Sequence, residues 1–184
     1  VMLSTVIMAA AFGTGDTLSY SIRNEAVTGL GLVDELIIPL RADQGDTIGR
    51  LYFPRERFDD LREIMAENRD IDGLTPQLAE TVAVLNTRTK LSAGQTRLAG
   101  LDPALLDGFG GFESSGDGVS RIADLADGEV LISTEAQDEL DAEVGDTLDM
   151  FLEDRSVAFT VAGIVERGGL AGVDPTVLMP ISQA

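Results

Sequence analysis

Short segments of alternating apolar and polar residues recur along this chain, and turn-forming residues separate them. Residues 81–87 (TVAVLNT) and 95–101 (QTRLAGL) alternate like two half-buried strands, and the short connection between them predicts an antiparallel pair. Further strands are predicted at residues 33–40, 129–133, 146–152, 157–166 and 176–180. Residues 153–156 are predicted to form a hairpin turn between two of them.

Helical patterns lie between these strands. Pro54 suits the first position of a helix, and Phe58, Leu61 and Met65 then follow on one apolar face. A polar stretch at residues 18–27 is also predicted to be helical. Strands and helices that interleave through short antiparallel connections predict an α+β fold.

Two further helix starts carry capping signals. Asp102 is predicted as an N-cap with Pro103 at the first helical position. Thr134 and Gln137 have the spacing of a capping box, which predicts a helix of two turns that ends near Gly145.

The first twelve residues, VMLSTVIMAAAF, are uncharged and mostly apolar. A bilayer span needs about 20 apolar residues, so this run is too short to cross a membrane alone. No basic region precedes it, which argues against a signal peptide. A buried helix and the outer end of a transmembrane helix both remain open, and the second is favoured because the run has no capping residue.

Charge limits the partners of the chain. Thirteen basic and 32 acidic residues give a net charge of −19, which argues against binding to nucleic acid or to anionic lipid. Between residues 101 and 155 there are 16 acids and two bases, a local net charge of −14. A solvated face that keeps the domain soluble accounts for this excess, and an acidic docking surface is the alternative.

The chain contains no Cys and no His. It therefore forms no disulfide, and it lacks the usual general base and the commonest ligands of transition metals. A Ser-His-Asp or Cys-His catalytic site cannot be assembled from these residues.

One motif imitates a calcium-binding loop. Asn68, Asp70, Asp72 and Gly73 match positions 1, 3, 5 and 6 of such a loop. The bidentate Glu is missing, because position 12 is Ala79. A helix end followed by an Asp-Gly turn explains the same residues, and we expect no calcium site.

Other candidate sites also have ordinary explanations. Gly13-Thr14-Gly15 lacks the third glycine of a nucleotide fingerprint, and Ser114-Ser115-Gly116 lacks the order of a nucleophile elbow. Lys90 lies near Ser92 in what is predicted to be an exposed turn, so we do not expect a Ser-Lys pair.

Acidic pairs could serve general acid-base chemistry. Glu139 and Glu143 are predicted to lie on one helical face, in the most acidic part of the chain. A solvated face explains this pair. We therefore predict no catalytic, cofactor-binding or metal-binding residues, no cofactor and no enzymatic activity.

The order and spacing of several motifs resemble the periplasmic core domain of MacB/FtsX-type ABC transporter permeases. The resemblance covers residues 128–140, the VGDT turn at 144–147 and the strand VAFTVAGIV at 157–165. The GLDP step at residues 100–103 and VLMPI at 177–181 also match. Residues 108–125 fit no part of the family pattern.

The resemblance implies a β-α-β porter-like layer with a smaller inserted α/β lobe. It implies a first transmembrane helix end and connecting helix at residues 1–29, a porter-like subdomain at 30–107 plus 169–184, and an inserted subdomain at 108–168.

The resemblance also implies a function. The domain is expected on the extracytoplasmic side of the cell (inner) membrane, where it couples cytoplasmic ATP hydrolysis to conformational change in export or lipoprotein handling. Implied partners are a cytoplasmic ATPase subunit, a second permease copy or paralogue and an extracytoplasmic protein. The alternative is a freestanding exported binding module that recognises a ligand or a protein through its acidic surface.

Overall fold

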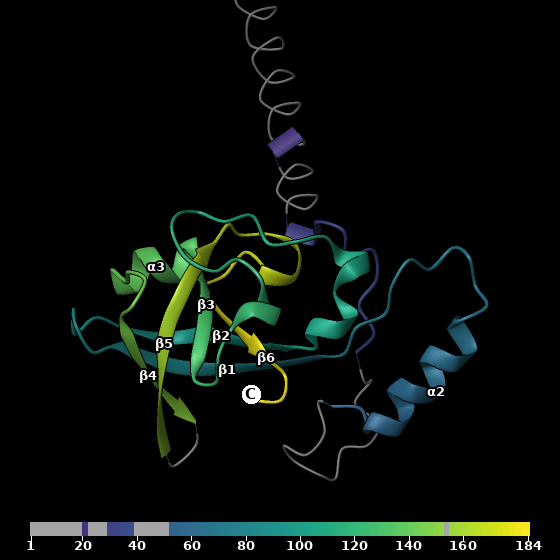
Figure 1. Cartoon of the computed structure of the whole chain (residues 1–184), viewed down its shortest axis with the longest axis horizontal. Coiled ribbons are helices and arrows are strands. Elements are labelled where there is room, and N and C mark those ends of the chain that lie inside the picture. Colours follow the sequence, from purple (N-terminus) through teal and green to yellow (C-terminus); the bar gives the residue numbers. More distant parts are fainter. Residues whose placement is uncertain (1–19, 22–28, 39–51, 153–154) are drawn as a thin grey trace, which may run out of the picture.

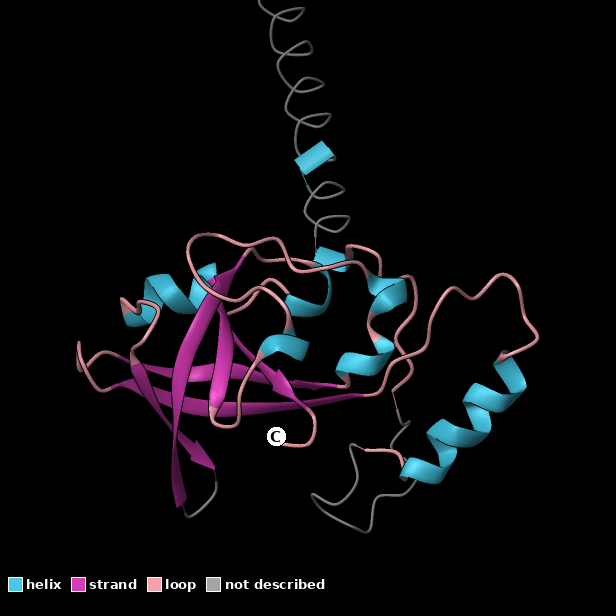
Figure 2. Cartoon of the chain, viewed as in Figure 1, coloured by secondary structure: helices cyan, strands magenta, loops and turns pink. Residues whose placement is uncertain are grey.

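The computed structural model describes residues 20–21, 29–38, 52–152 and 155–184. Six strands form a closed barrel in the order β1-β2-β6-β3-β5-β4. Figures 1 and 2 show the barrel on one side of the described structure and a helix, α2 (Arg55–Met65), standing apart on the other. The chain thus combines helices and strands as the sequence predicts.

The first half of the barrel is a long hairpin. β1 (Gln77–Asn86) and β2 (Ser92–Leu101) pair antiparallel, which confirms the predicted pairing, and a register shift interrupts the ladder between Val82 and Val84. β6 (Thr176–Pro180) lies parallel to β2.

The second half comes from the middle of the chain. β3 (Glu129–Ser133) lies parallel to β5 (Arg155–Val165), and β4 (Thr147–Leu152) pairs antiparallel with β5. The β1–β4 pairing closes the barrel, with Ala83 opposite Phe151. The barrel therefore combines strands from the ranges assigned to the two subdomains, whose boundaries stay a prediction.

Alternation along the strands divides the apolar residues between two clusters, because successive side chains point to opposite faces. The barrel interior is filled by buried side chains from all six strands, among them Val84, Leu98, Ile132 and Met150. A second cluster covers the outside of β2, β3 and β6. Its buried members are Ala99, Leu101, Ile122, Leu131, Val165, Ala171 and Leu178.

Short helices cover this barrel. α3 (Thr134–Leu140) places Ala136 and Leu140 in the barrel interior cluster. The outer cluster is covered by residues in and around four 3-10 turns: η1 (Pro103–Leu105), η2 (Asp107–Phe109), η3 (Ile122–Asp124) and η4 (Gly169–Ala171). The predicted loop around residues 108–118 contains η2 and an isolated bridge between Ser114 and Val165.

The predicted caps are confirmed at Asp102 and shifted at α3. Asp102 Oδ1 accepts a hydrogen bond from Ala104 N at 3.0 Å, at the start of η1. At α3 the N-cap is Ser133, whose Oγ accepts from Ala136 N at 3.3 Å, so the prediction of Thr134 was one residue late. The helix ends at Leu140, well before the predicted Gly145, because Asp141 turns the chain into the left-handed region at φ 46°.

α2 (Arg55–Met65) begins one residue later than predicted, because Pro54 is its N-cap and not its first helical residue, and the helix stands away from the barrel. Phe58, Leu61 and Met65 share its half-buried face, and no residue of α2 is fully buried. The predicted strand at residues 33–40 is wrong over the part described, since residues 33–38 have no strand partner and Ile38 is 66% exposed.

Two predictions lie mostly or wholly outside the described residues. The apolar run at 1–12 is one of them, and of the predicted helix at 18–27 only Tyr20 and Ser21 are described, both helical. Within the described ranges, no helix combines the length and the apolar character needed to cross a bilayer.

Candidate functional site

A buried carboxylate in the VGDT turn is the centre of a hydrogen-bond network in the described barrel. Asp146 directly precedes β4 and is 8% exposed. Its Oδ1 accepts a hydrogen bond from Arg88 Nε at 2.7 Å. Its Oδ2 accepts from Asn86 Nδ2 and from the backbone N of Glu143, both at 2.9 Å. Both carboxylate oxygens are therefore satisfied within the domain.

This arrangement keeps Asp146 ionised. The hydrogen bond from Arg88 is the main reason that the pKa of Asp146 falls to about 2, against the opposing effect of burial. The same hydrogen bond raises the pKa of Arg88. A carboxylate held this far below neutral pH is a poor general acid or base. The group suits a structural role.

The same side chains hold the end of α3. Asn86 Nδ2 donates to the carbonyl of Leu140 at 3.3 Å and Thr89 Oγ1 donates to it at 2.8 Å. Arg88 Nη2 donates to the carbonyl of Asp141 at 2.7 Å. Carbonyls at a helix C-terminus have no partner within the helix, so these bonds fasten α3 to the β1–β2 hairpin.

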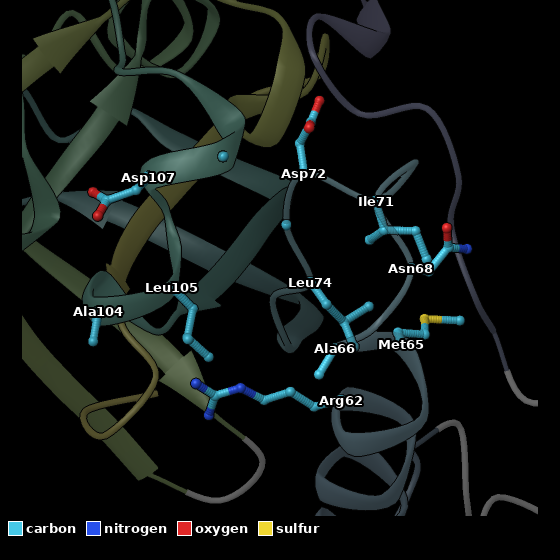
Figure 3. A pocket seen from close by; sticks show the side chains of 12 residues that line it. Arg62, Met65, Ala66, Asn68, Ile71, Asp72, Leu74, Ala104, Leu105 and Asp107 are labelled. Atoms are coloured by element: carbon cyan, nitrogen blue, oxygen red, sulfur yellow. The ribbon is translucent and has the colours of Figure 1, made fainter.

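A shallow hollow of about 320 Å³ lies between the C-terminal end of α2 and the turns η1 and η2. Figure 3 shows Arg62 reaching from α2 toward the side of the hollow formed by these turns. Its lining residues are Arg62, Met65, Ala66, Asn68, Ile71, Asp72, Gly73, Leu74, Ala104, Leu105, Asp107 and Gly108. The hollow combines apolar side chains with one cation and two carboxylates, and no pair of converging acids dominates it.

The calcium-like motif at residues 68–73 contributes to the lining of this hollow and also forms a turn. Asn68 Oδ1 accepts a hydrogen bond from the backbone N of Asp70 at 3.0 Å, which is the side-chain-to-backbone bond of an Asx turn. Asn68, Asp72 and Gly73 line the hollow, while Asp70 is exposed. Within the described ranges, no cluster of three or more acidic side chains is placed to hold a metal ion.

The remaining candidate residues are not brought together as sites. Lys90 occupies the exposed hairpin between β1 and β2 with φ 63°. Ser114 Oγ donates to the carbonyl of Gly116 at 2.8 Å, within its own turn. Glu143 lies beyond the end of α3, so the expected helical face with Glu139 is wrong. Gly13-Thr14-Gly15 lies outside the described residues.

Two further polar contacts, which the sequence did not predict, involve barrel strands: one joins Tyr52 to β1 and the other joins β2 to β1. The Tyr52 hydroxyl lies 3.0 Å from the carbonyl oxygen of Ala79 and forms a hydrogen bond with the Glu80 carboxylate. Partial burial, followed by that hydrogen bond, raises the pKa of Tyr52 to about 12. Arg97 Nη2 donates to Gln77 Oε1 at 3.1 Å, and burial lowers the pKa of Arg97. Sequence alone gives no signal for either contact, because the first depends on how the segment before α2 lies against β1 and the second on the register of the sheet.

Comparison with known proteins identifies the family. The sequence model of the MacB-like periplasmic core domain matches residues 1–184, and the chain belongs to this family. This confirms the resemblance that the VGDT turn and the strand at 157–165 carry. A search of curated proteins gives no match.

Solved structures that the comparison matches to this chain include two transporter regions. The periplasmic region of MacB from Actinobacillus actinomycetemcomitans is 18% identical with a TM-score of 0.46, and the match covers 68% of this chain and 55% of that one. The extracellular domain of the noncanonic ABC-type transporter YknZ from Gram-positive bacteria is 14% identical with a TM-score of 0.47, covering 71% of this chain and 63% of that one. In both cases the match spans less than two thirds of the solved domain.

Proposed function

We propose that this chain is the extracytoplasmic domain of an ABC transporter permease, on the outer side of the cell (inner) membrane, and that it couples cytoplasmic ATP hydrolysis to conformational change there. The observation that carries the proposal is the match of the MacB-like periplasmic core domain along all 184 residues. The process that this coupling serves is export or lipoprotein handling.

The construction of the barrel supports a mechanical role. Its interior is filled with apolar side chains, and the Arg88–Asp146 pair fastens the turn before β4 to the β1–β2 hairpin. A packed body of this kind moves as one unit, because close-packed interiors transmit displacement and resist deformation. Such a role depends on packing and needs no catalytic residue, in line with a domain that is not an enzyme.

The partners follow from the same proposal. A cytoplasmic ATPase subunit supplies the energy, and a second permease copy or paralogue completes the transporter. An extracytoplasmic protein is the third partner. The porter-like layer at residues 30–107 plus 169–184 and the inserted lobe at 108–168 belong to this proposal as its division of the domain.

The test is ATP-dependent movement of the barrel in the intact transporter. The full permease and its ATPase are reconstituted in vesicles, with other cysteines replaced and Asp138→Cys on α3 carrying a fluorophore. This stretch contains no native Cys, so the label is unique within it. We expect energy transfer to an acceptor in the lipid surface to change when ATP is hydrolysed. An unchanged signal, in a complex that hydrolyses ATP, contradicts coupling through this domain.

A further inference from the structure

Residues 29–32, which we call the entering segment, touch the barrel through the backbone of a glycine. At Gly31, with φ 56°, an added Cβ would lie 2.8 Å from the Cα of Gly169 and 3.1 Å from its N. Gly169 itself has φ 54°. Two chain segments far apart in sequence therefore meet backbone to backbone, an approach that only glycine permits at Gly31.

Neighbouring residues extend this contact. A Cβ at Gly29 would lie 3.1 Å from Cγ1 of Val173. Leu32 contacts a second loop, since a Cβ at Gly110 would lie 3.1 Å from its Cδ1. In Figure 1 the purple segment starts beside the yellow loop that carries η4. The entering segment is thus held against two loops on one side of the barrel.

The loop that carries Gly169 is itself fixed to the barrel. Gly168 N donates to the carbonyl of Gly172 at 2.6 Å, and Gly172 N donates to that of Gly169 at 3.0 Å. Ala171 is fully buried in the outer apolar cluster. Arg97 packs so closely that a Cβ at Gly172 would lie 2.5 Å from its Nη1. A force applied to Gly169 therefore reaches the β2–β6 side of the barrel directly.

We propose that Gly29, Gly31 and Gly169 form a glycine joint that fixes the entering segment to the barrel, so that displacement of this segment turns the barrel as one body. The inference rests on the proposed function, because it names the contact through which movement reaches the barrel. Side-chain contacts could yield by changing rotamers, whereas a contact between two backbones has no such freedom.

The first test loosens the joint in the reconstituted transporter with the label at Asp138→Cys. Gly31→Ala introduces a methyl group into the contact and puts a side chain on a backbone that is already left-handed, and the second effect alone should weaken the closed contact by about ten-fold. Gly111→Ala is the matched control, because a Cβ there meets no atom within 4 Å. We expect Gly31→Ala to lose most of the ATP-dependent change in energy transfer and Gly111→Ala to keep it.

The second test locks the joint. The position of Val173 Cγ1 relative to a Cβ at Gly29 resembles that of the far sulfur in a disulfide, so Gly29→Cys with Val173→Cys should cross-link on oxidation. A joint that stays closed through the cycle predicts that the cross-linked transporter retains the ATP-dependent change. If Gly31→Ala does not fold, the cross-linked variant still tests whether the joint stays closed during the cycle.

The outcomes separate the two proposals. No ATP-dependent change in the wild type refutes coupling through the domain and the joint with it. If folded Gly31→Ala shows the same ATP-dependent change in energy transfer as the wild type, the joint is overturned and coupling through the domain stands. Loss of the change on cross-linking, with recovery on reduction, also overturns it, because the contact would then have to open during the cycle.

Discussion

Arg88 Nε lies 2.7 Å from Asp146 Oδ1, although 58 residues separate the two in sequence. Arg88 belongs to the hairpin between β1 and β2, and Asp146 to the turn before β4. The pair therefore joins the two halves of the barrel close to the β1–β4 seam that closes it. It also explains why an aspartate follows the glycine of the VGDT turn in this protein.

Removing the charge of Asp146 should destabilise the domain. The pKa of Asp146 is about 2 in the folded state and about 3.9 for an unfolded aspartate, so its ionisation stabilises the fold by about 2.5 kcal/mol at neutral pH. Asp146→Asn should lower the free energy of unfolding by about this amount in urea titrations at pH 7. Asp138→Asn, an exposed position on α3, is the control and should change little.

The Arg88–Asp146 pair should also make the stability of the domain depend on pH. Because the folded-state pKa is the lower one, the stabilisation is complete above about pH 4 and is lost as the pH falls toward about 2. Below that range, wild type and Asp146→Asn should have similar stabilities, while at pH 7 they differ. An equal difference at pH 7 and at pH 2 would show that the substitution acts through packing and not through charge.

The outer apolar cluster should contribute to the stability of the domain. Leu131 is fully buried on the outward face of β3, beneath the segments around the 3-10 turns. Leu131→Ala should cost about 2–5 kcal/mol in the free energy of unfolding. Leu91→Ala, at a position 45% exposed in the β1–β2 hairpin, is the control and should cost far less. A loss at Leu131 no larger than at Leu91 would mean that the covering segments do not pack as described.

Tyr52 should tether the segment before α2 to β1. Its hydroxyl contacts the Ala79 carbonyl and Glu80, and its pKa is raised to about 12. In ultraviolet titration, a tyrosine should ionise near pH 12, and Tyr52→Phe should remove this step. The protonated form is the one stabilised, so the tether is lost as the pH rises from about 10 to about 12.

The consequence for α2 can be measured separately. Because α2 has no fully buried residue, it depends on such contacts for its position. Tyr52→Phe should therefore speed amide hydrogen exchange in α2 and leave β3 unchanged. Unchanged exchange in α2 would mean that other contacts hold the helix.

Calcium should not stabilise the domain. The side chain of Asn68 accepts a backbone hydrogen bond within its own turn, which accounts for this residue of the motif without a metal. About 10 mM calcium exceeds the dissociation constants of even weak extracellular sites. We expect the melting temperature to match that in equal magnesium. A rise seen with calcium alone, and abolished by Asp70→Asn, contradicts this.

The strands were largely predictable because their signal is local. Residues 129–133 have an apolar centre, Val130-Leu131-Ile132, with two β-branched side chains, and β3 has these bounds. Strand partners were not predictable in the same way. The β1–β4 pairing that places Ala83 opposite Phe151 closes the barrel, and alternation alone does not specify which strands meet.

The errors have physical causes of the same kind. Residues 33–40 have the composition of a strand, but a strand also needs a partner, and residues 33–38 have none in the described structure. Thr134 and Ser133 are both good N-caps, so the sequence signal could not choose between them. Arg88 was missed as the partner of Asp146 because a contact over 58 residues leaves no local pattern.

The central claim is that this domain lies outside the cytoplasm as part of a permease. Its most direct test is labelling of the full-length gene product in spheroplasts, with Asp138→Cys as the single cysteine and a membrane-impermeant maleimide. We predict the same extent of labelling before and after the cells are lysed, with a cytoplasmic cysteine marker labelled only after lysis. Labelling of Asp138→Cys only after lysis would contradict the claim.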